Sequence, residues 1–160
     1  MNEIVKNKFF YQDGNLYRKY SSGGKKEGSI CGWTTVCNGT KYKKININYK
    51  TYYLHQIIYL YHHGYIPEYI DHKDGNSLNN KIENLRSATQ SQNCANQKLR
   101  TTNTSGIKGV VFNKKTKKWT ASIMVKGKHI SLGHFLKIED AKKAYEIGSI
   151  KYFGEFARHE

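Results

Sequence analysis

The segment Tyr69–Asn93, which reads YIDHKDGNSLNNKIENLRSATQSQN, limits what this chain can fold into more than any other. It begins with a short extended run in which alternation would place the Asp71 and His72 side chains on opposite sides of the backbone. Lys73–Asn76 supplies the residues of a tight turn, and Leu78–Leu85 is polar and rich in asparagine. The segment therefore predicts a strand followed by a polar loop rather than by a helix.

Helix-compatible residues begin at about Ser87, with Ser87 or Thr89 as the candidate N-cap. Asn93 would then lie one to two turns into a helix. His72 can serve as a general base because a neutral imidazole titrates near neutral pH. Oxygen ligands from Asp71 and Asn93 suit a hard cation such as Mg²⁺ or Mn²⁺. A base beside a divalent cation is the combination that phosphodiester hydrolysis requires.

At these residues the chain resembles the HNH (ββα-metal) endonucleases, and within them the phage and intron-associated group whose core reads DHxDGNxxNNxxxNLRxxTxxxN. The resemblance implies that His72 is the general base and that Asp71 and Asn93 bind one divalent metal ion, Mg²⁺ or Mn²⁺. It also implies that Asn84, at the end of the loop, positions the loop and the imidazole. Asn96, one helical turn after Asn93, is the alternative ligand.

The residues upstream agree with the strand and helix that often precede this core in the family, from Tyr53 through Gly64 to Pro67. Gln56 stands where the family usually has an arginine, so a phosphate contact or ion pair is not expected there. Three histidines lie on or beside this expected helix, and we interpret them as packing residues rather than metal ligands: His55, His62 and His63.

The charge of the chain points to a polyanionic partner. It has 27 Lys plus Arg against 12 Asp plus Glu, a formal net charge of +15, and an isoelectric point near 9.7. No Asp or Glu occurs between Glu83 and Glu139, a span that holds many lysines. This distribution favours double-stranded DNA as the partner. RNA is a weaker alternative. Membrane binding is not expected, because the sequence has no basic amphipathic helix with an aromatic face.

The sequence also predicts where the protein works. No apolar run is long enough to span a bilayer, and the N-terminus MNEIVKNKFF lacks the apolar core of a signal peptide. The three cysteines, Cys31, Cys37 and Cys94, lack paired spacing and are interpreted as free thiols. We expect an intracellular, cytoplasmic protein, in a bacterial host if a phage encodes it.

The pattern predicts an α+β chain of two modules. Residues 1–97 form the HNH module, residues 98–105 an exposed basic linker, and residues 106–160 a second module. In the first, alternating runs at Phe9–Arg18 and Tyr42–Asn48 predict strands, another strand leads into Tyr53, and Leu54 to Tyr61 has helical spacing.

The second module alternates clearly. Apolar residues at 119, 121, 123 and 125 share one face, Lys126–Lys128 forms a hairpin turn, and Ile130 and Leu132 rejoin the apolar side. Glu139 and Asp140 then open a helix. Its packing stripe is Ala141, Ala144, Tyr145 and Gly148. The pattern predicts a three-stranded antiparallel sheet backed by one helix.

This module resembles the AP2/ERF DNA-binding domain, on the landmarks Gly109-Val110, Trp119, Leu132-Gly133, Phe135 and the AxxAY motif of Ala141 to Tyr145. The resemblance implies that the exposed face of the sheet enters the major groove, without transferring a recognition sequence. The candidate DNA contacts are Lys98, Arg100, Lys108, Lys118, Ser122, Met124, Lys128, His129 and Ser131.

The pairing of these two resemblances indicates a DNA endonuclease, as in phage homing endonucleases, that hydrolyses duplex DNA by a one-metal mechanism. The alternative from another class is a sequence-specific DNA-binding regulator that keeps an inactive HNH fold. Sequence alone leaves open whether the protein is a monomer or a homodimer, and therefore whether it nicks DNA or cuts both strands.

Overall fold

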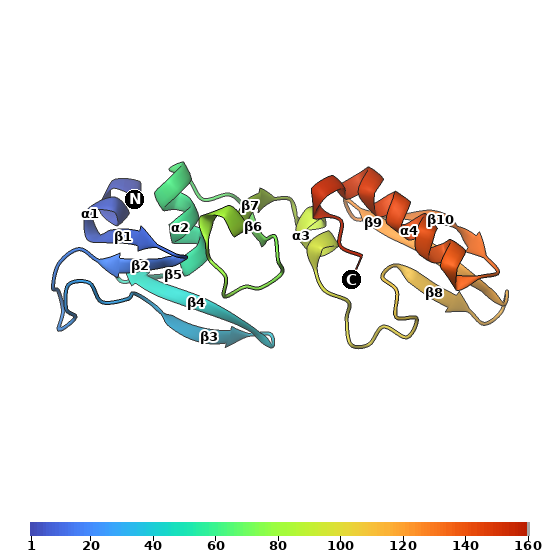
Figure 1. Cartoon of the computed structure of the whole chain (residues 1–160), viewed down its shortest axis with the longest axis horizontal. Coiled ribbons are helices and arrows are strands. Elements are labelled where there is room, and N and C mark those ends of the chain that lie inside the picture. Colours follow the sequence, from blue (N-terminus) through green and yellow to red (C-terminus); the bar gives the residue numbers. More distant parts are fainter. Residues whose placement is uncertain (160) are drawn as a thin grey trace. The chain divides into compact units, whose positions relative to one another are not determined.

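A computed structural model describes residues 1–159. It divides into two compact units, residues 1–87 and the residues from Ala88 onward (Figure 1). The sequence predicts the end of the first module at Gln97, ten residues later than this division. The helix that follows Thr89 therefore clusters with the second unit. Each unit is described by itself below.

The first unit begins with a helix and a hairpin, continues through a three-stranded sheet and a longer helix, and ends with a short pair of strands. Its elements are α1 (Asn2–Lys8), β1 (Phe9–Gln12), β2 (Asn15–Arg18), β3 (Trp33–Cys37), β4 (Thr40–Ile47), β5 (Lys50–Tyr53), α2 (Leu54–His63), β6 (Tyr69–His72), the 3-10 turn η1 (Ile82–Asn84) and β7 (Leu85–Ala88).

The strands of the first unit form three small sheets, with the orders β1-β2, β3-β4-β5 and β6-β7. Ile45 and Ile47 alternate along β4 and are buried against α2, whose Leu54, Ile57 and Ile58 are fully buried. A glycine in the left-handed conformation, Gly64, ends α2. The core thus lies between α2 and one face of the β3-β4-β5 sheet.

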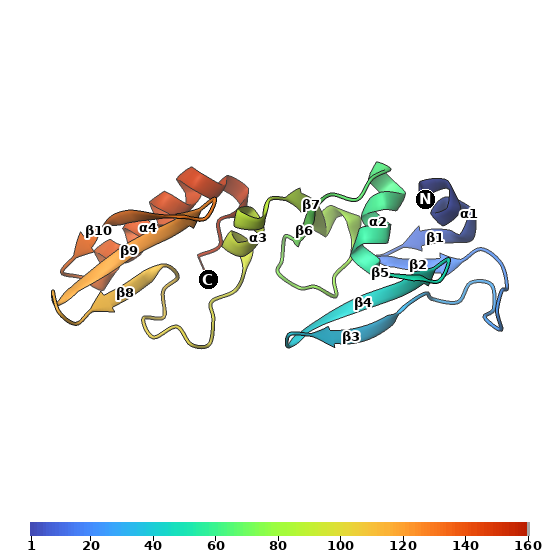
Figure 2. The same ribbon diagram turned by 180° about the vertical axis from the view of Figure 1, so that it is seen from behind.

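The second unit holds a short helix, a three-stranded antiparallel sheet of order β10-β9-β8, and a long helix that packs on that sheet (Figure 2). Its elements are α3 (Gln90–Asn96), β8 (Val110–Asn113), β9 (Lys118–Val125), β10 (Lys128–Phe135), α4 (Ile138–Phe153) and η2 (Gly154–Phe156). The predicted sheet, its hairpin turn and its helix are all present. The AP2/ERF assignment is a separate proposal.

Alternation along β9 sets the two faces of this sheet. Ala121 and Ile123 are buried against Ala141 and Tyr145 of α4, as the sequence predicts. Lys126 and Gly127 both have positive φ at the turn into β10. At Gly109 (φ +67°), an added Cβ would overlap the Tyr145 ring, so the close approach of β8 to α4 requires glycine.

One helix boundary differs from the prediction. Ser87 lies in β7, and Thr89 is the N-cap of α3, where its hydroxyl accepts a hydrogen bond from the Gln92 backbone N–H at 3.3 Å. Among residues 1–159, no helix combines the length and the apolar character needed to cross a membrane.

Candidate active site

Asp71 and His72 lie next to each other on β6, and both side chains are buried. Asp71 accepts a hydrogen bond from the Nε of Arg86 on β7, with 2.8 Å between Nε and Oδ2. The two side chains are only 4% and 11% exposed, so this is a nearly buried ion pair. Pairing between β6 and β7 brings the two residues together across the Asn-rich loop.

The imidazole of His72 meets a second buried side chain, Asn80. Nε2 of His72 lies 3.1 Å from Oδ1 of Asn80, which is 2% exposed. Because an amide oxygen only accepts, this contact places a proton on Nε2, and Nδ1 is then the basic nitrogen of a neutral His72. The pKa of His72 is lowered by burial, against the opposing effects of the Asn80 hydrogen bond and of Asp74 and Asp71.

The turn between β1 and β2 supports Asn80 from behind. Gly14 in this turn has φ +74°, and a Cβ there would lie 2.8 Å from the Lys81 backbone nitrogen and 2.9 Å from the Asn80 carbonyl carbon. No other residue fits this close approach. Asp13 of the same turn forms an ion pair with Lys81 at 3.5 Å. The first hairpin therefore holds the backbone from which Asn80 reaches His72.

Asn84 organises the loop between β6 and β7. Its Nδ2 donates to Oδ1 of Asp74 at 3.0 Å and to the Asn79 carbonyl at 2.8 Å, and its Oδ1 accepts from the Asp74 backbone N–H at 3.1 Å. Burial alone would raise the pKa of Asp74, but hydrogen bonds from Asn79, Asn76 and Asn84 lower it below its ordinary value. Asn84 contacts the loop, whereas Asn80 contacts the imidazole.

A second histidine, His55, packs against His72. The rings of His55 and His72 meet edge to face with centroids 5.1 Å apart, and the Tyr53 ring stacks on His55 with centroids 5.4 Å apart. Burial, together with the nearby His72, lowers the pKa of His55 to about 3. His55 is thus a neutral packing residue, in agreement with the sequence-based interpretation.

The candidate ligands on α3 belong to the second unit, so each is described there. Asn93 is half-buried, and Asn96, the alternative, is buried. Within residues 1–159, no three His, Cys, Asp or Glu side chains cluster in a way that could hold a metal ion. A carboxylate with amide oxygens does not need such a cluster, because Mg²⁺ usually keeps several of its own waters.

Several predicted DNA contacts share the outward face of the β10-β9-β8 sheet, the face turned away from α4. His129 pairs with Met124 and Ser131 pairs with Ser122 across β10 and β9, and Lys118 lies on the same face by alternation. Met124 is 51% exposed. Lys128 pairs with Val125, which packs against the α4 side, so cross-strand register places Lys128 on the other face.

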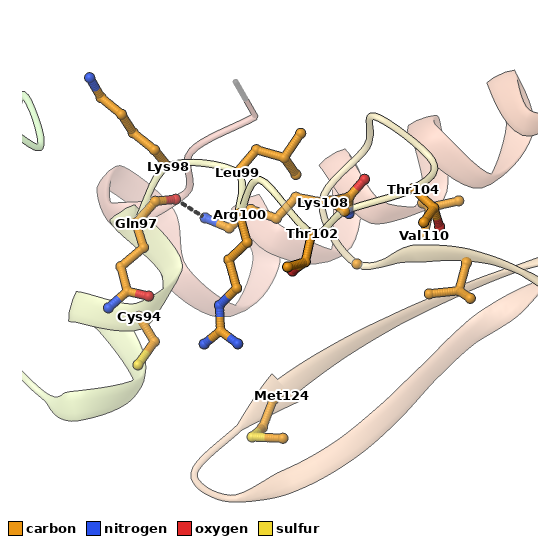
Figure 3. Close-up of a pocket in the computed structure, with 13 residues that line it drawn as sticks. Cys94, Gln97, Lys98, Leu99, Arg100, Thr102, Thr104, Lys108, Val110 and Met124 are labelled. Atoms are coloured by element: carbon orange, nitrogen blue, oxygen red, sulfur yellow. Dashed lines mark hydrogen bonds between the residues drawn. The ribbon is translucent and has the colours of Figure 1, made fainter. Parts of the chain in front are cut away.

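The remaining candidates surround the end of α3. Lys108 is half-buried, and its Nζ donates to the backbone carbonyl of Ala95 and to that of Gln97. Figure 3 shows the second of these hydrogen bonds. Burial lowers its pKa to about 8. Lys98 and Arg100 are exposed and line a cavity of about 490 Å³, together with Met124 (Figure 3). Lys108 therefore caps a helix terminus, whereas the Lys98 and Arg100 side chains remain accessible to solvent.

Sequence reasoning did not single out Asn80 or Arg86 as site residues. Both occur in the segment that carries the family pattern, as the second Asn of Asn79-Asn80 and the Arg of Asn84-Leu85-Arg86. Their contacts cross the loop, so only pairing of β6 with β7 reveals them. Gln56, in the place of the usual arginine, accepts a hydrogen bond from the Tyr53 backbone N–H at 3.2 Å and so caps α2.

Part of the chain is similar to known proteins. Residues 52–95 match the family model described as HNH endonuclease. The chain is 43% identical over 67 residues to Protein 3.8 of Escherichia phage T7, covering 41% of this chain and 55% of that protein. It is 36% identical over 107 residues to an uncharacterized HNH endonuclease of Acanthamoeba polyphaga mimivirus, covering 65% of this chain and 54% of that protein.

The chain spans about half the length of the curated relatives it matches. No solved structure matches it. The matched residues include β6, the Asn-rich loop, β7 and most of α3, which carry all four predicted catalytic and metal-binding residues: Asp71, His72, Asn84 and Asn93. Residues 52–95 of this chain are an HNH endonuclease domain.

Proposed function

We propose that this protein is a metal-dependent HNH endodeoxyribonuclease that hydrolyses phosphodiester bonds in double-stranded DNA. The observation that carries the proposal is the buried His72 imidazole, held by Asn80 and placed beside Asp71 within the HNH domain. The net charge of +15 supports a polyanionic substrate. The products are DNA ends with a 5′-phosphate and a 3′-hydroxyl.

His72 is the general base in this proposal. Neutral His72 accepts a proton at Nδ1 from the attacking water, because Nε2 already carries the proton that bonds to Asn80. Burial favours the neutral imidazole and so keeps the base active to lower pH. Asn80 is nearly inaccessible, and its Nδ2 has no hydrogen-bond partner among residues 1–159. This unpaired donor costs stability, which supports a role in positioning His72.

Asp71 and Asn93 are the proposed ligands of one divalent ion, Mg²⁺ or Mn²⁺. The donor set fits such an ion, because a carboxylate and an amide carbonyl provide the oxygen ligands that hard cations prefer. When bound, the metal would stabilise negative charge on the phosphate and the leaving oxygen. Arg86 fixes the orientation of the Asp71 carboxylate, and Asn84 holds the loop that follows.

The second unit is the proposed DNA-binding module, similar to AP2/ERF domains. Its outward sheet face offers Ser122, Met124, His129 and Ser131 to base edges, with Lys118 near the phosphates. Lys98 and Arg100 extend the basic surface. A nuclease domain joined to a separate DNA-binding module suits an enzyme that cuts at a chosen site, so homing is the proposed biological role.

Cleavage of supercoiled plasmid tests the proposal. The purified protein is incubated with Mg²⁺ or Mn²⁺, and in parallel with EDTA. Metal-dependent conversion to open circles or linear DNA is expected, and the first product distinguishes nicking from double-strand cleavage. Ligation of the products without kinase treatment checks the 5′-phosphate. Tight DNA binding without cleavage in either metal would instead favour a regulator with an inactive HNH fold.

A further inference from the structure

One face of the β3-β4-β5 sheet carries a row of aromatic and cationic side chains. Trp33 on β3 pairs with Lys44 on β4, and Lys44 pairs with Tyr53 on β5, so the register places the three side chains on one face. Ile45 and Ile47 alternate with Lys44 along β4 and are buried on the opposite face. The Trp33–Lys44–Tyr53 row thus lies on the side turned away from the core.

The row leads directly to the proposed base. Nζ of Lys44 lies 5.2 Å from the centroid of the Tyr53 ring, and Tyr53 stacks on His55, whose ring meets His72. Trp33, at the far end of the row, is 45% exposed. A ligand lying along this face would therefore extend from an accessible indole toward the catalytic imidazole.

The charge around the row has one sign. No Asp or Glu occurs between Glu27 and Glu68, so none of the three strands contains an acid, whereas β4 and β5 contain four lysines. The Ser77 hydroxyl, in the loop after His72, donates to the Lys41 carbonyl at 2.5 Å and ties this sheet to the active-site loop. A cationic surface that also offers a flat aromatic ring complements nucleic acid better than it complements a protein.

We propose that the Trp33–Lys44–Tyr53 row is a second DNA-contact surface, which holds the duplex in the first unit beside His72. Lys44 binds a backbone phosphate, and Trp33 packs against the sugars or base edges of the adjoining nucleotides. The inference rests on the proposed function, since duplex DNA is the substrate. It adds a contact that belongs to the HNH unit itself, separate from the sheet of the second unit.

Lys50 provides a matched control for Lys44. It lies on β5 of the same sheet, its Nζ is 5.4 Å from the Tyr52 ring centroid, and its pairing with Ile47 places it on the opposite face. Lys44→Ala and Lys50→Ala therefore remove the same charge and the same type of ring contact. Only the first removes them from the proposed DNA surface.

Affinity for a duplex is measured by fluorescence anisotropy at several salt concentrations in EDTA, where no cutting occurs. One lost phosphate contact lowers the slope of log K against log salt by about 0.9. We expect this loss in Lys44→Ala and an unchanged slope in Lys50→Ala. Equal slopes for the two variants would overturn the proposal. Urea unfolding of both variants checks that they remain folded.

Trp33 gives an independent readout. The chain has two tryptophans, so Trp119→Phe leaves Trp33 as the sole indole. DNA should change its emission and protect it from acrylamide. The proposal would be overturned if DNA changed neither the emission of Trp33 nor its quenching by acrylamide. It would also be overturned if the protein were a dimer that Trp33→Ala converts to monomers, because a second copy of the chain would then cover this face.

The two proposals fail in different ways. If the wild type cuts plasmid but Lys44→Ala binds as Lys50→Ala does, the surface is wrong and the nuclease stands. If the wild type never cuts but Lys44→Ala alone loses salt-dependent affinity, the DNA surface stands and the nuclease is wrong.

Discussion

Replacing Asn80 by alanine should slow DNA cleavage without weakening DNA binding. The variant removes the acceptor that lies 3.1 Å from Nε2 of His72. The proton on Nε2 then loses its buried partner, and the tautomer with the proton on Nδ1 becomes competitive. That tautomer cannot accept a proton at Nδ1. The chemical step should therefore slow because a smaller fraction of His72 is in the active form.

The magnitude follows from the hydrogen bond and its burial. Leaving a buried donor without its acceptor costs about 1–3 kcal/mol. At about 1.4 kcal/mol for each factor of ten, the ratio of the two tautomers should shift by roughly tenfold to a hundredfold toward the inactive form, and kcat should fall in proportion to the remaining fraction of the active tautomer. Asn80 is 2% exposed and cannot touch DNA, so KM should stay the same. Asn80→Asp restores an oxygen acceptor and should recover much of the rate.

Single-turnover cleavage measures the rate, and ¹⁵N NMR of the His72 ring measures the tautomer directly. The matched control is Asn79→Ala, because the Asn79 amide donates to Oδ2 of Asp74 at 2.7 Å and shows no contact with His72. The reasoning would be refuted if Asn80→Ala left kcat unchanged, or if the two alanine variants slowed cleavage equally. A raised KM at constant kcat would also contradict it.

Four further substitutions have defined outcomes. Arg86→Ala removes the guanidinium from the buried ion pair with Asp71. The free energy of unfolding in urea should therefore fall by about 3 kcal/mol, as it does when other buried ion pairs are broken. A fall of less than about 0.5 kcal/mol would contradict this account. His55 has a folded pKa of about 3 against 6.5 in the unfolded chain, so the unfolded state binds the extra proton between these values and stability falls as pH drops below 6.5. His55→Leu should lower the slope of unfolding free energy against pH by about 1.4 kcal/mol per pH unit in this range. An unchanged slope in acid unfolding curves would show that His55 does not cause this pH dependence. Lys108→Met should destabilise the second unit by about 2 kcal/mol, because the Lys108 ammonium donates to two backbone carbonyls. Lys118 is exposed, so Lys118→Met should weaken DNA binding without lowering stability. Thermal melting and fluorescence anisotropy of both variants test this, and the reverse outcome would refute both assignments.

Elements with a one-sided burial pattern could be predicted from the sequence. Ala121 and Ile123 alternate with outward residues in β9, and Ala141 and Tyr145 recur at helical spacing in α4. The apolar pattern therefore predicts which faces of β9 and α4 pack together in the core. β3 shows no such alternation because most of its residues are exposed on both faces. Pairing with β4 creates this strand, and pairing is not local information. α1 is likewise too short for a periodic pattern, with Val5 as its single buried residue.

The candidate site divides in the same way. The spacing within the segment predicts Asp71, His72 and Asn84 as site residues. It does not reveal which side chain touches which. His72 bonds to Asn80 rather than Asn84, and Asp71 pairs with Arg86, because the pairing of β6 with β7 and the path of the loop between them set those distances. The charge of Lys108 predicts a DNA contact, yet packing beside α3 directs its ammonium group to the backbone carbonyls of Ala95 and Gln97.

The most direct test of the central claim compares wild type and His72→Ala in cleavage and in binding. The substrate is a plasmid that the wild type cuts in Mg²⁺ or Mn²⁺, and the affinity of both proteins for a DNA fragment from it is measured in EDTA. We predict that His72→Ala binds this DNA as tightly as the wild type and leaves the plasmid intact. Cleavage by His72→Ala at the wild-type rate would contradict the assignment of His72 as the general base.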